Sequence, residues 1–175
     1  TIYNWLLDGT NLAGQGGWAA AGAAWAVAAV QDFTNDQKAD LLFRNTGDGS
    51  LALWTMDGVN ATAYAVMASP GAEWAYRGAG DFNADGRADV LWQNTTSGQA
   101  YVWLMNGAAI AGQGAPGSAG AGWSVATIAD YSGDGRADVL WRHTDGSNYL
   151  WQMNGTTIAA QGGMGVVAGD WLLAA

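Results

Sequence analysis

The sequence predicts an all-β fold built from repeated units, and three observations lead to that expectation. The string GDFNADGRADVLW, which contains Asp81, recurs 49 residues later as ADYSGDGRADVLW around Asp130, and a weaker copy, QDFTNDQKADLLF, contains Asp32. Tryptophans precede Asx-Gly pairs at matching places in successive units. The 27 glycines and the two-residue alternation of large side chains disfavour helices. A constant spacing of this kind is the signature of a repeat protein.

One repeat, which begins at Trp74, predicts four strands. The strands are expected at residues 74–80, 90–93, 101–105 and 108–113. Between the third and fourth lies Asn106-Gly107, a strong hairpin signal because both residues tolerate a positive φ. Four strands per unit, with aromatic residues at fixed positions, predict the blades of a β-propeller rather than a helical solenoid.

We expect one propeller domain over residues 1–175. It would contain three complete repeats and a partial blade, at residues 25–73, 74–122, 123–170 and 1–17. The partial blade has a third strand at 2–7 and a fourth at 11–15, and a first strand at 171–175 would complete it. These units amount to about 3.75 blades. Three arrangements remain open: a closed ring of four blades, part of a larger ring, or a ring completed by oligomerisation.

The loop that joins the first and second strands of each repeat carries oxygen-bearing side chains at alternate positions. Hard oxygen ligands wrapped by a sharp, glycine-bearing turn are what Ca²⁺ prefers. We therefore predict two Ca²⁺ sites and a weaker third site in the first loop, where Gln37 replaces the glycine. A non-glycine residue in the left-handed conformation costs about 1 kcal/mol. The expected ligands are Asp81, Asn83, Asp85, the Arg87 carbonyl and Asp89; Asp130, Ser132, Asp134, the Arg136 carbonyl and Asp138; and Asp32, Thr34, Asp36, the Lys38 carbonyl and Asp40.

Two other interpretations of these loops are weaker. An EF-hand needs Glu at the twelfth loop position, which here holds Trp92, Trp141 or Phe43 within a strand. Ordinary Asx turns would explain the Asp, Asn and Gly content, but three acids within nine residues repel one another unless a cation is present. Mg²⁺ fits less well, because it retains its waters and takes fewer protein ligands.

Composition excludes several classes of function. Fifteen acidic residues face six basic ones, and three bound Ca²⁺ would bring the formal charge of −9 to −3. Nucleic acid is excluded as a partner, since phosphate binding needs clustered Lys and Arg. The longest apolar stretch, Trp18–Val30, is too short to span a membrane. Cysteine is absent, so no disulfide framework is expected.

No catalytic constellation is visible, and we expect a protein that is not an enzyme. The one histidine, His143, takes the position of Asn45 and Asn94 in the other repeats, which suggests a surface residue at a strand end. Tryptophans at repeat-matched positions are expected to pack one blade against the next. Trp18 has no matching tryptophan in the other repeats and is the best candidate for an exposed contact.

The GDFNxDGxxD loop followed by a hydrophobic strand resembles the FG-GAP/VCBS repeat, and the resemblance covers nearly the whole chain. It implies propeller blades with calcium between the first and second strands, and a role in extracellular binding, adhesion or as a module attached to an enzyme. We therefore expect a secreted or cell-surface module for protein binding, adhesion or assembly. Its partner would be another protein or a second copy of the chain. A carbohydrate-binding lectin and an accessory domain of a larger secreted enzyme are the alternatives, since some related propellers are lectins.

Overall fold

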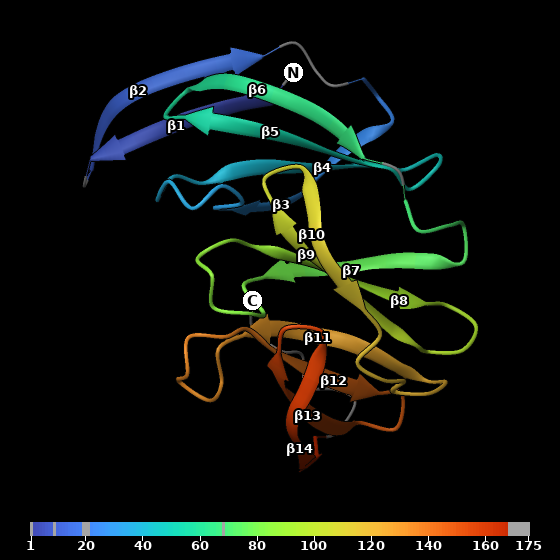
Figure 1. The fold of residues 1–175 in the computed structure, drawn as a ribbon. Coiled ribbons are helices and arrows are strands. Elements are labelled where there is room, and N and C mark those ends of the chain that lie inside the picture. The colour runs from blue at the N-terminus through green and yellow to red at the C-terminus, as the bar shows by residue number, and fades with distance from the viewer. Residues whose placement is uncertain (1, 9, 19–21, 68, 168–175) are drawn as a thin grey trace.

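A computed structural model describes residues 2–8, 10–18, 22–67 and 69–167. Within these ranges the chain forms fourteen strands joined by turns, and no helix is present (Figure 1). All strand pairs inside the sheets are antiparallel. The predicted all-β class is confirmed.

Three of the sheets have four strands each, which pair in the order in which they follow one another along the chain. Sheet A contains β3 (Trp25–Gln31), β4 (Asp40–Asn45), β5 (Leu51–Asp57) and β6 (Asn60–Met67). Sheet B contains β7 (Trp74–Gly80), β8 (Asp89–Asn94), β9 (Ala100–Asn106) and β10 (Ala109–Gly114). Sheet C contains β11 (Trp123–Ala129), β12 (Asp138–His143), β13 (Ser147–Asn154) and β14 (Thr157–Val166).

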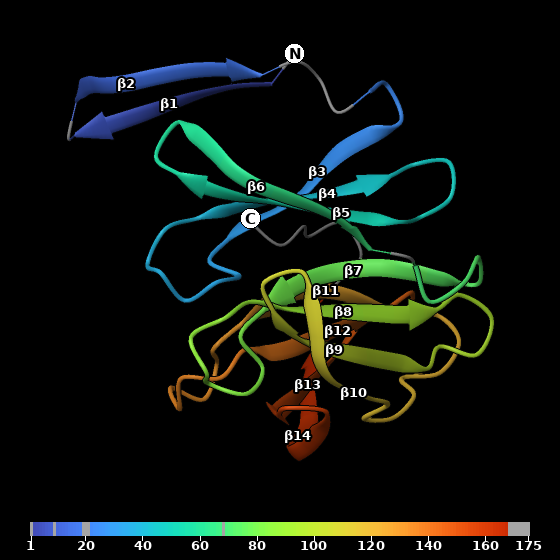
Figure 2. The ribbon, with the colours of Figure 1, turned by 45° about the horizontal axis from the view of Figure 1, so that its top comes forward.

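A two-stranded hairpin precedes these sheets. It consists of β1 (Ile2–Asp8) and β2 (Asn11–Trp18), where a third and a fourth strand were predicted. In Figure 2 the hairpin lies beyond sheet A, at the end of the stack opposite sheet C. The first strand predicted at 171–175 lies outside the described residues, as does the side chain of Trp18.

The sequence repeat is also a repeat of backbone geometry. The pairing of the first and second strands shifts register at the same place in each sheet, between Val27 and Ala29, between Tyr76 and Gly78, and between Val125 and Thr127. The predicted four-stranded unit of about fifty residues is confirmed in sheets A, B and C.

Each sheet packs an aliphatic face against the aromatic face of the next sheet. Leu42 and Leu53 of sheet A pack in one core with Trp92 and Trp103 of sheet B. Sheet C repeats this arrangement with Trp141 and Trp151, which pack with the aliphatic face of sheet B. The paired tryptophan rings are tilted, with centroids 5.0 Å apart in sheet B and 4.8 Å apart in sheet C. Trp92, Trp103, Trp141 and Trp151 therefore pack one sheet against the next, as predicted for the repeat-matched tryptophans. Trp5, at the same repeat position as Trp103, does not, because it is 67% exposed on the hairpin.

The first strands approach one another closely. Strand β7 contacts both β3 and β11. At Gly80, a Cβ atom would lie 2.7 Å from the Cβ of Ala137, so a larger residue would force β7 away from the acidic loop that precedes β12. This contact requires glycine, because real Cβ atoms do not come so near one another.

We predict unequal costs for truncating two equivalent aromatic residues. Phe82 follows β7 and is fully buried against sheet C, whereas its counterpart Tyr131 is 44% exposed. Phe82→Ala should lower the free energy of unfolding by about 3–5 kcal/mol, and Tyr131→Ala by less than about 1 kcal/mol. Urea unfolding followed by tryptophan fluorescence measures both values. Equal costs would contradict the packing described for sheets B and C.

Candidate metal centre

The three acidic loops, residues 32–39, 81–88 and 130–137, are folded around the carboxylate of their first residue. Asp81 accepts hydrogen bonds from the backbone N–H groups of Asn83, Asp85 and Gly86, at 3.3, 3.2 and 2.8 Å. Asp130 accepts the corresponding bonds from Gly133, Asp134 and Gly135, at 2.7, 3.2 and 2.9 Å. Asp32 is likewise surrounded by backbone donors of its own loop. Each loop therefore holds an anionic group at its centre.

The sixth loop position has a left-handed backbone conformation, which glycine adopts without strain. Gly86 and Gly135 have φ of 83° and 84°, in the left-handed region. In the first loop Gln37 takes this conformation with φ 65°, so the strain predicted from the sequence at this position is present. The fourth loop position is left-handed in all three loops, at Asn35, Ala84 and Gly133, with φ of 61°, 59° and 75°.

The aspartate at the ninth position is buried and ties three segments together. Asp89 is completely buried; its Oδ2 accepts the N–H of Phe82 at 2.9 Å and its Oδ1 accepts the N–H of Met105 at 2.8 Å. It thus links the start of β8 to the acidic loop and to the third strand, β9. Asp40 and Asp138 make the same two bonds in sheets A and C. The sequence predicted metal ligands here and missed this anchoring, although a Met follows each aspartate at a nearly constant distance and could have indicated it.

Burial raises the pKa of Asp89 to about 7. The N–H donors of Met105 and Phe82 lower it, while the negative charges of Asp85 and Asp81 raise it further. Burial also raises the pKa of Asp40. The pKa of the exposed Asp130 is lowered instead, because its carboxylate accepts hydrogen bonds from the N–H of Gly135 and of neighbouring residues. Ionised Asp89 lies in surroundings where a nearby cation would be favourable.

The charged side chain at the seventh position pairs with the aspartate at the fifth. Arg87 Nη1 lies 3.7 Å from Asp85 Oδ2, and Arg136 Nη1 lies 3.0 Å from Asp134 Oδ2. In the first loop Lys38 Nζ lies 3.8 Å from Asp36 and 3.0 Å from Asp57. From the sequence, only the backbone carbonyls of Lys38, Arg87 and Arg136 were expected to have a role, and these ion pairs were not predicted.

The structure places the predicted ligands of each site on one acidic loop, apart from the ninth aspartate, which opens the following strand. Within the described ranges, no three His, Cys, Asp or Glu side chains lie close enough together to hold a metal ion. The donor chemistry nevertheless fits Ca²⁺, since carboxylate, amide, hydroxyl and carbonyl oxygens are its preferred ligands. Binding at the second loop would require the carboxylate of Asp85 to leave Arg87.

The acidic loops also connect neighbouring sheets through their backbone. The carbonyl of Asp32 accepts the N–H of Ala88 at 2.7 Å, and the carbonyl of Asp81 accepts the N–H of Ala137 at 2.6 Å. A second pair of bonds runs from the hairpin turn of the next sheet, Gly107 N–H to the Phe33 carbonyl at 2.9 Å and Gly155 N–H to the Phe82 carbonyl at 2.7 Å. The conformation of each loop is thus coupled to the docking of the following sheet, which the sequence did not predict.

His143 lies at the end of β12, as predicted. Its Nδ1 is 2.9 Å from Asp145 and its ring lies 5.0 Å from that of Trp123. In the described part of the chain no helix is long and apolar enough to cross a membrane.

These features define a repeat protein in which an acidic loop opens the second strand of every four-stranded sheet. The model of the FG-GAP-like repeat matches residues 32–92 and again 81–141. Each match runs from one acidic loop to the second strand of the next sheet, and together they cover more than half of the chain, which therefore belongs to the FG-GAP-like repeat family. Comparisons with curated proteins and with solved structures found no match.

We predict that two aspartates of one repeat, Asp89 and Asp85, contribute unequally to the free energy of unfolding. In calcium-free buffer, Asp89→Ala leaves the buried N–H groups of Phe82 and Met105 without an acceptor and should cost about 2–5 kcal/mol of unfolding free energy. Asp85→Ala removes a partly exposed ion pair and should cost less than about 1 kcal/mol. Chemical denaturation in excess chelator measures both costs, and a larger loss for Asp85→Ala would refute the anchoring role of Asp89.

Proposed function

We propose that this chain is a calcium-organised β-propeller module that acts outside the cell by binding a protein partner, without catalytic chemistry of its own. The observation that carries the proposal is the acidic loop, which concentrates negative charge and at the same time hydrogen-bonds the backbone of the next sheet. A cation that fixes this loop would also fix the docking of sheet on sheet. FG-GAP-like repeats are generally interaction modules rather than catalysts.

The arrangement of the sheets supports a propeller. Sheets A, B and C follow one another in order, and their first strands β3, β7 and β11 lie side by side, as the inner strands of blades do. Strands β1 and β2 have the sequence of a third and a fourth strand and would supply the outer half of a further blade. The ring would have four blades, be larger, or be completed by another copy of the chain.

Ca²⁺ would be held by the oxygens of the second and third loops, from Asp81 to Asp89 and from Asp130 to Asp138, and more weakly by the first loop. The first loop carries the non-glycine residue Gln37 at the left-handed sixth position, where the other two loops have Gly86 and Gly135. Its Lys38 is also shared between two aspartates. An extracellular medium rich in calcium would fill such sites without the need for high affinity.

A protein-binding surface is available on the outer strands. Large apolar side chains are exposed on β1 and on β6, where Trp5, Tyr64 and Val66 are 67%, 77% and 63% accessible. Large exposed apolar side chains on outer strands are positions where a protein partner would dock. The acidic net charge of −9 favours a basic partner.

Calcium binding is tested by unfolding and calorimetry of the purified chain in calcium, in magnesium and in excess chelator. We expect stabilisation by calcium alone, of about 2.7 kcal/mol per site when the free ion is at 100 times its Kd. Titration should give two sites. Asp81→Asn should remove one site and Asp130→Asn the other, whereas Asp48→Asn, in the turn between β4 and β5, should remove none. Absence of calcium-dependent heat and of any shift in stability would refute the proposal.

A further inference from the structure

Strand β7 carries an arginine that has no acidic partner. Of the six Lys and Arg residues of the chain, Lys38, Arg87 and Arg136 form ion pairs with aspartates. No Asp or Glu of the described residues lies within ion-pair distance of Arg77, although fifteen acidic residues face six basic ones. A guanidinium without a counter-ion of its own is available to an anion from outside.

A buried glutamine holds the guanidinium of Arg77 in place. The Nε–H of Arg77 donates to Oε1 of Gln93 at 2.8 Å, and Nε2 of Gln93 donates to the carbonyl of Trp123 at 2.9 Å. Gln93 is 2% exposed, whereas Arg77 is open to solvent. Among the described residues Arg77 makes no other hydrogen bond, so its Nη1 and Nη2 groups, the fork that binds carboxylates, are unused.

A small pocket lies beside this arginine, between sheets B and C. Its volume is about 60 Å³, and Arg77 is the one charged side chain among the described residues that line it. Asn94 and Thr95, at the end of β8, and glycines of the adjoining turns also line it. Because Oδ1 of Asn94 already accepts the N–H groups of Thr96 and Ser97, this side chain offers a ligand N–H donors. The size and the donors suit one small anionic group.

The neighbouring sheets show that the fold does not require an arginine at this place. Arg77 is the extra residue at the register shift between β7 and β8, and sheets A and C have Ala28 and Ala126 there. On the second strand, sheet B has Gln93 where sheet A has Arg44. Sheet B thus combines an arginine on its first strand with a glutamine that accepts its Nε–H, and sheets A and C do not form this pair.

A second arginine adds positive charge near the pocket. Burial, followed by the positive charge of Arg44, lowers the pKa of Arg77. Within the described part of the chain Arg44 has no acidic partner either, and its Nε has no acceptor. Two like charges that repel each other are stabilised by an anion bound close to them.

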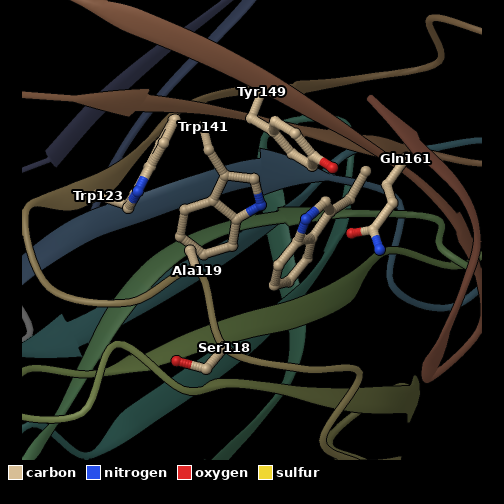
Figure 3. Close-up of a pocket in the computed structure, with 7 residues that line it drawn as sticks. Ser118, Ala119, Trp123, Trp141, Tyr149 and Gln161 are labelled. Carbon is tan, nitrogen blue, oxygen red and sulfur yellow. The ribbon is translucent and has the colours of Figure 1, made fainter. Parts of the chain in front are cut away.

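The pocket differs from the larger hollow of about 250 Å³ on the same side of sheet C. Trp123 lines both, but the hollow is otherwise formed by neutral side chains, among them Tyr149 and Gln161 (Figure 3). Because no charged side chain is among the described residues that line the hollow, an anion has nothing to bind there. Tyr149 therefore serves as an internal reference for binding at Arg77.

We propose that the pocket beside Arg77 binds a carboxylate group of an external ligand, with its two oxygens on Nη1 and Nη2 of the guanidinium. A carboxylate matches the planar fork and carries the single charge that one arginine neutralises. A doubly charged phosphate would be opposed more strongly by the net charge of −9. This function goes beyond the calcium-organised protein-binding role and does not depend on it, because no acidic-loop residue lines the pocket.

The test follows the Nε–H signal of Arg77 and the side-chain amide signals of Gln93 by two-dimensional ¹⁵N NMR of the full 175-residue chain. Sodium acetate is titrated in calcium-containing Tris buffer at constant ionic strength, and acetamide, which has the same shape without the charge, is the comparison. We expect acetate to shift both sets of signals in a saturable way, with Tyr149 unaffected. No saturable shift at high millimolar acetate, or an equal shift with acetamide, would overturn the proposal. Tighter binding of methyl phosphate would overturn the assignment to carboxylates.

Two variants and a control locate the binding. Arg77→Ala introduces the residue that sheets A and C have at this place and should weaken acetate binding about tenfold or more, the equivalent of one charge-assisted hydrogen bond, as reported by the Gln93 amide. Arg77→Lys keeps the charge without the fork and should also weaken it, which covers the case that Arg77→Ala disturbs sheet B. Arg142→Gln, at the position of sheet C that corresponds to Gln93, should leave the affinity unchanged. Unaltered affinity in both Arg77 variants would refute the proposal.

Discussion

The buried aspartate that opens the second strand of each four-stranded sheet is the interaction on which the rest of the structure depends. Its two carboxylate oxygens accept one N–H from the acidic loop and one from the third strand. Hydrogen bonds to a charged acceptor contribute about 1.5–3 kcal/mol each, against a desolvation cost of similar size. With the loop fixed in this way, the Asp81 carbonyl is in place to accept the N–H of Ala137 from the following sheet. One side chain therefore connects strand pairing within a sheet to docking between sheets.

The strands could be predicted from the sequence because their signals are local. Trp74, the Asn106-Gly107 turn and the alternation in 101–105 each act within a few residues, and the structure confirms the strands they predict. The acidic loops could also be located, and the left-handed backbone at Gln37 was foreseen. Their role as metal sites stays a prediction.

The missed features depend on contacts between segments that are far apart in the chain. Nothing in the local sequence states that the Asp89 carboxylate reaches Met105, or that the carbonyl of Asp81 accepts the N–H of Ala137. Repeat-matched tryptophans were expected to be packing residues, and Trp141 is one. That its indole N–H has no acceptor among the described residues could not be predicted from the sequence.

The central claim, that the acidic loops bind neighbouring sheets into one unit, is tested most directly by native-state hydrogen exchange. The amides of Ala88 and Ala137 donate to the loops of the preceding sheets. They should exchange only through global unfolding, at the same free energy as the strand amides of Leu91 and Val139. Addition of calcium should slow all four amides by one common factor. Exchange of Ala88 and Ala137 at the rate of freely fraying loops, while the strand amides stay protected, would contradict the account.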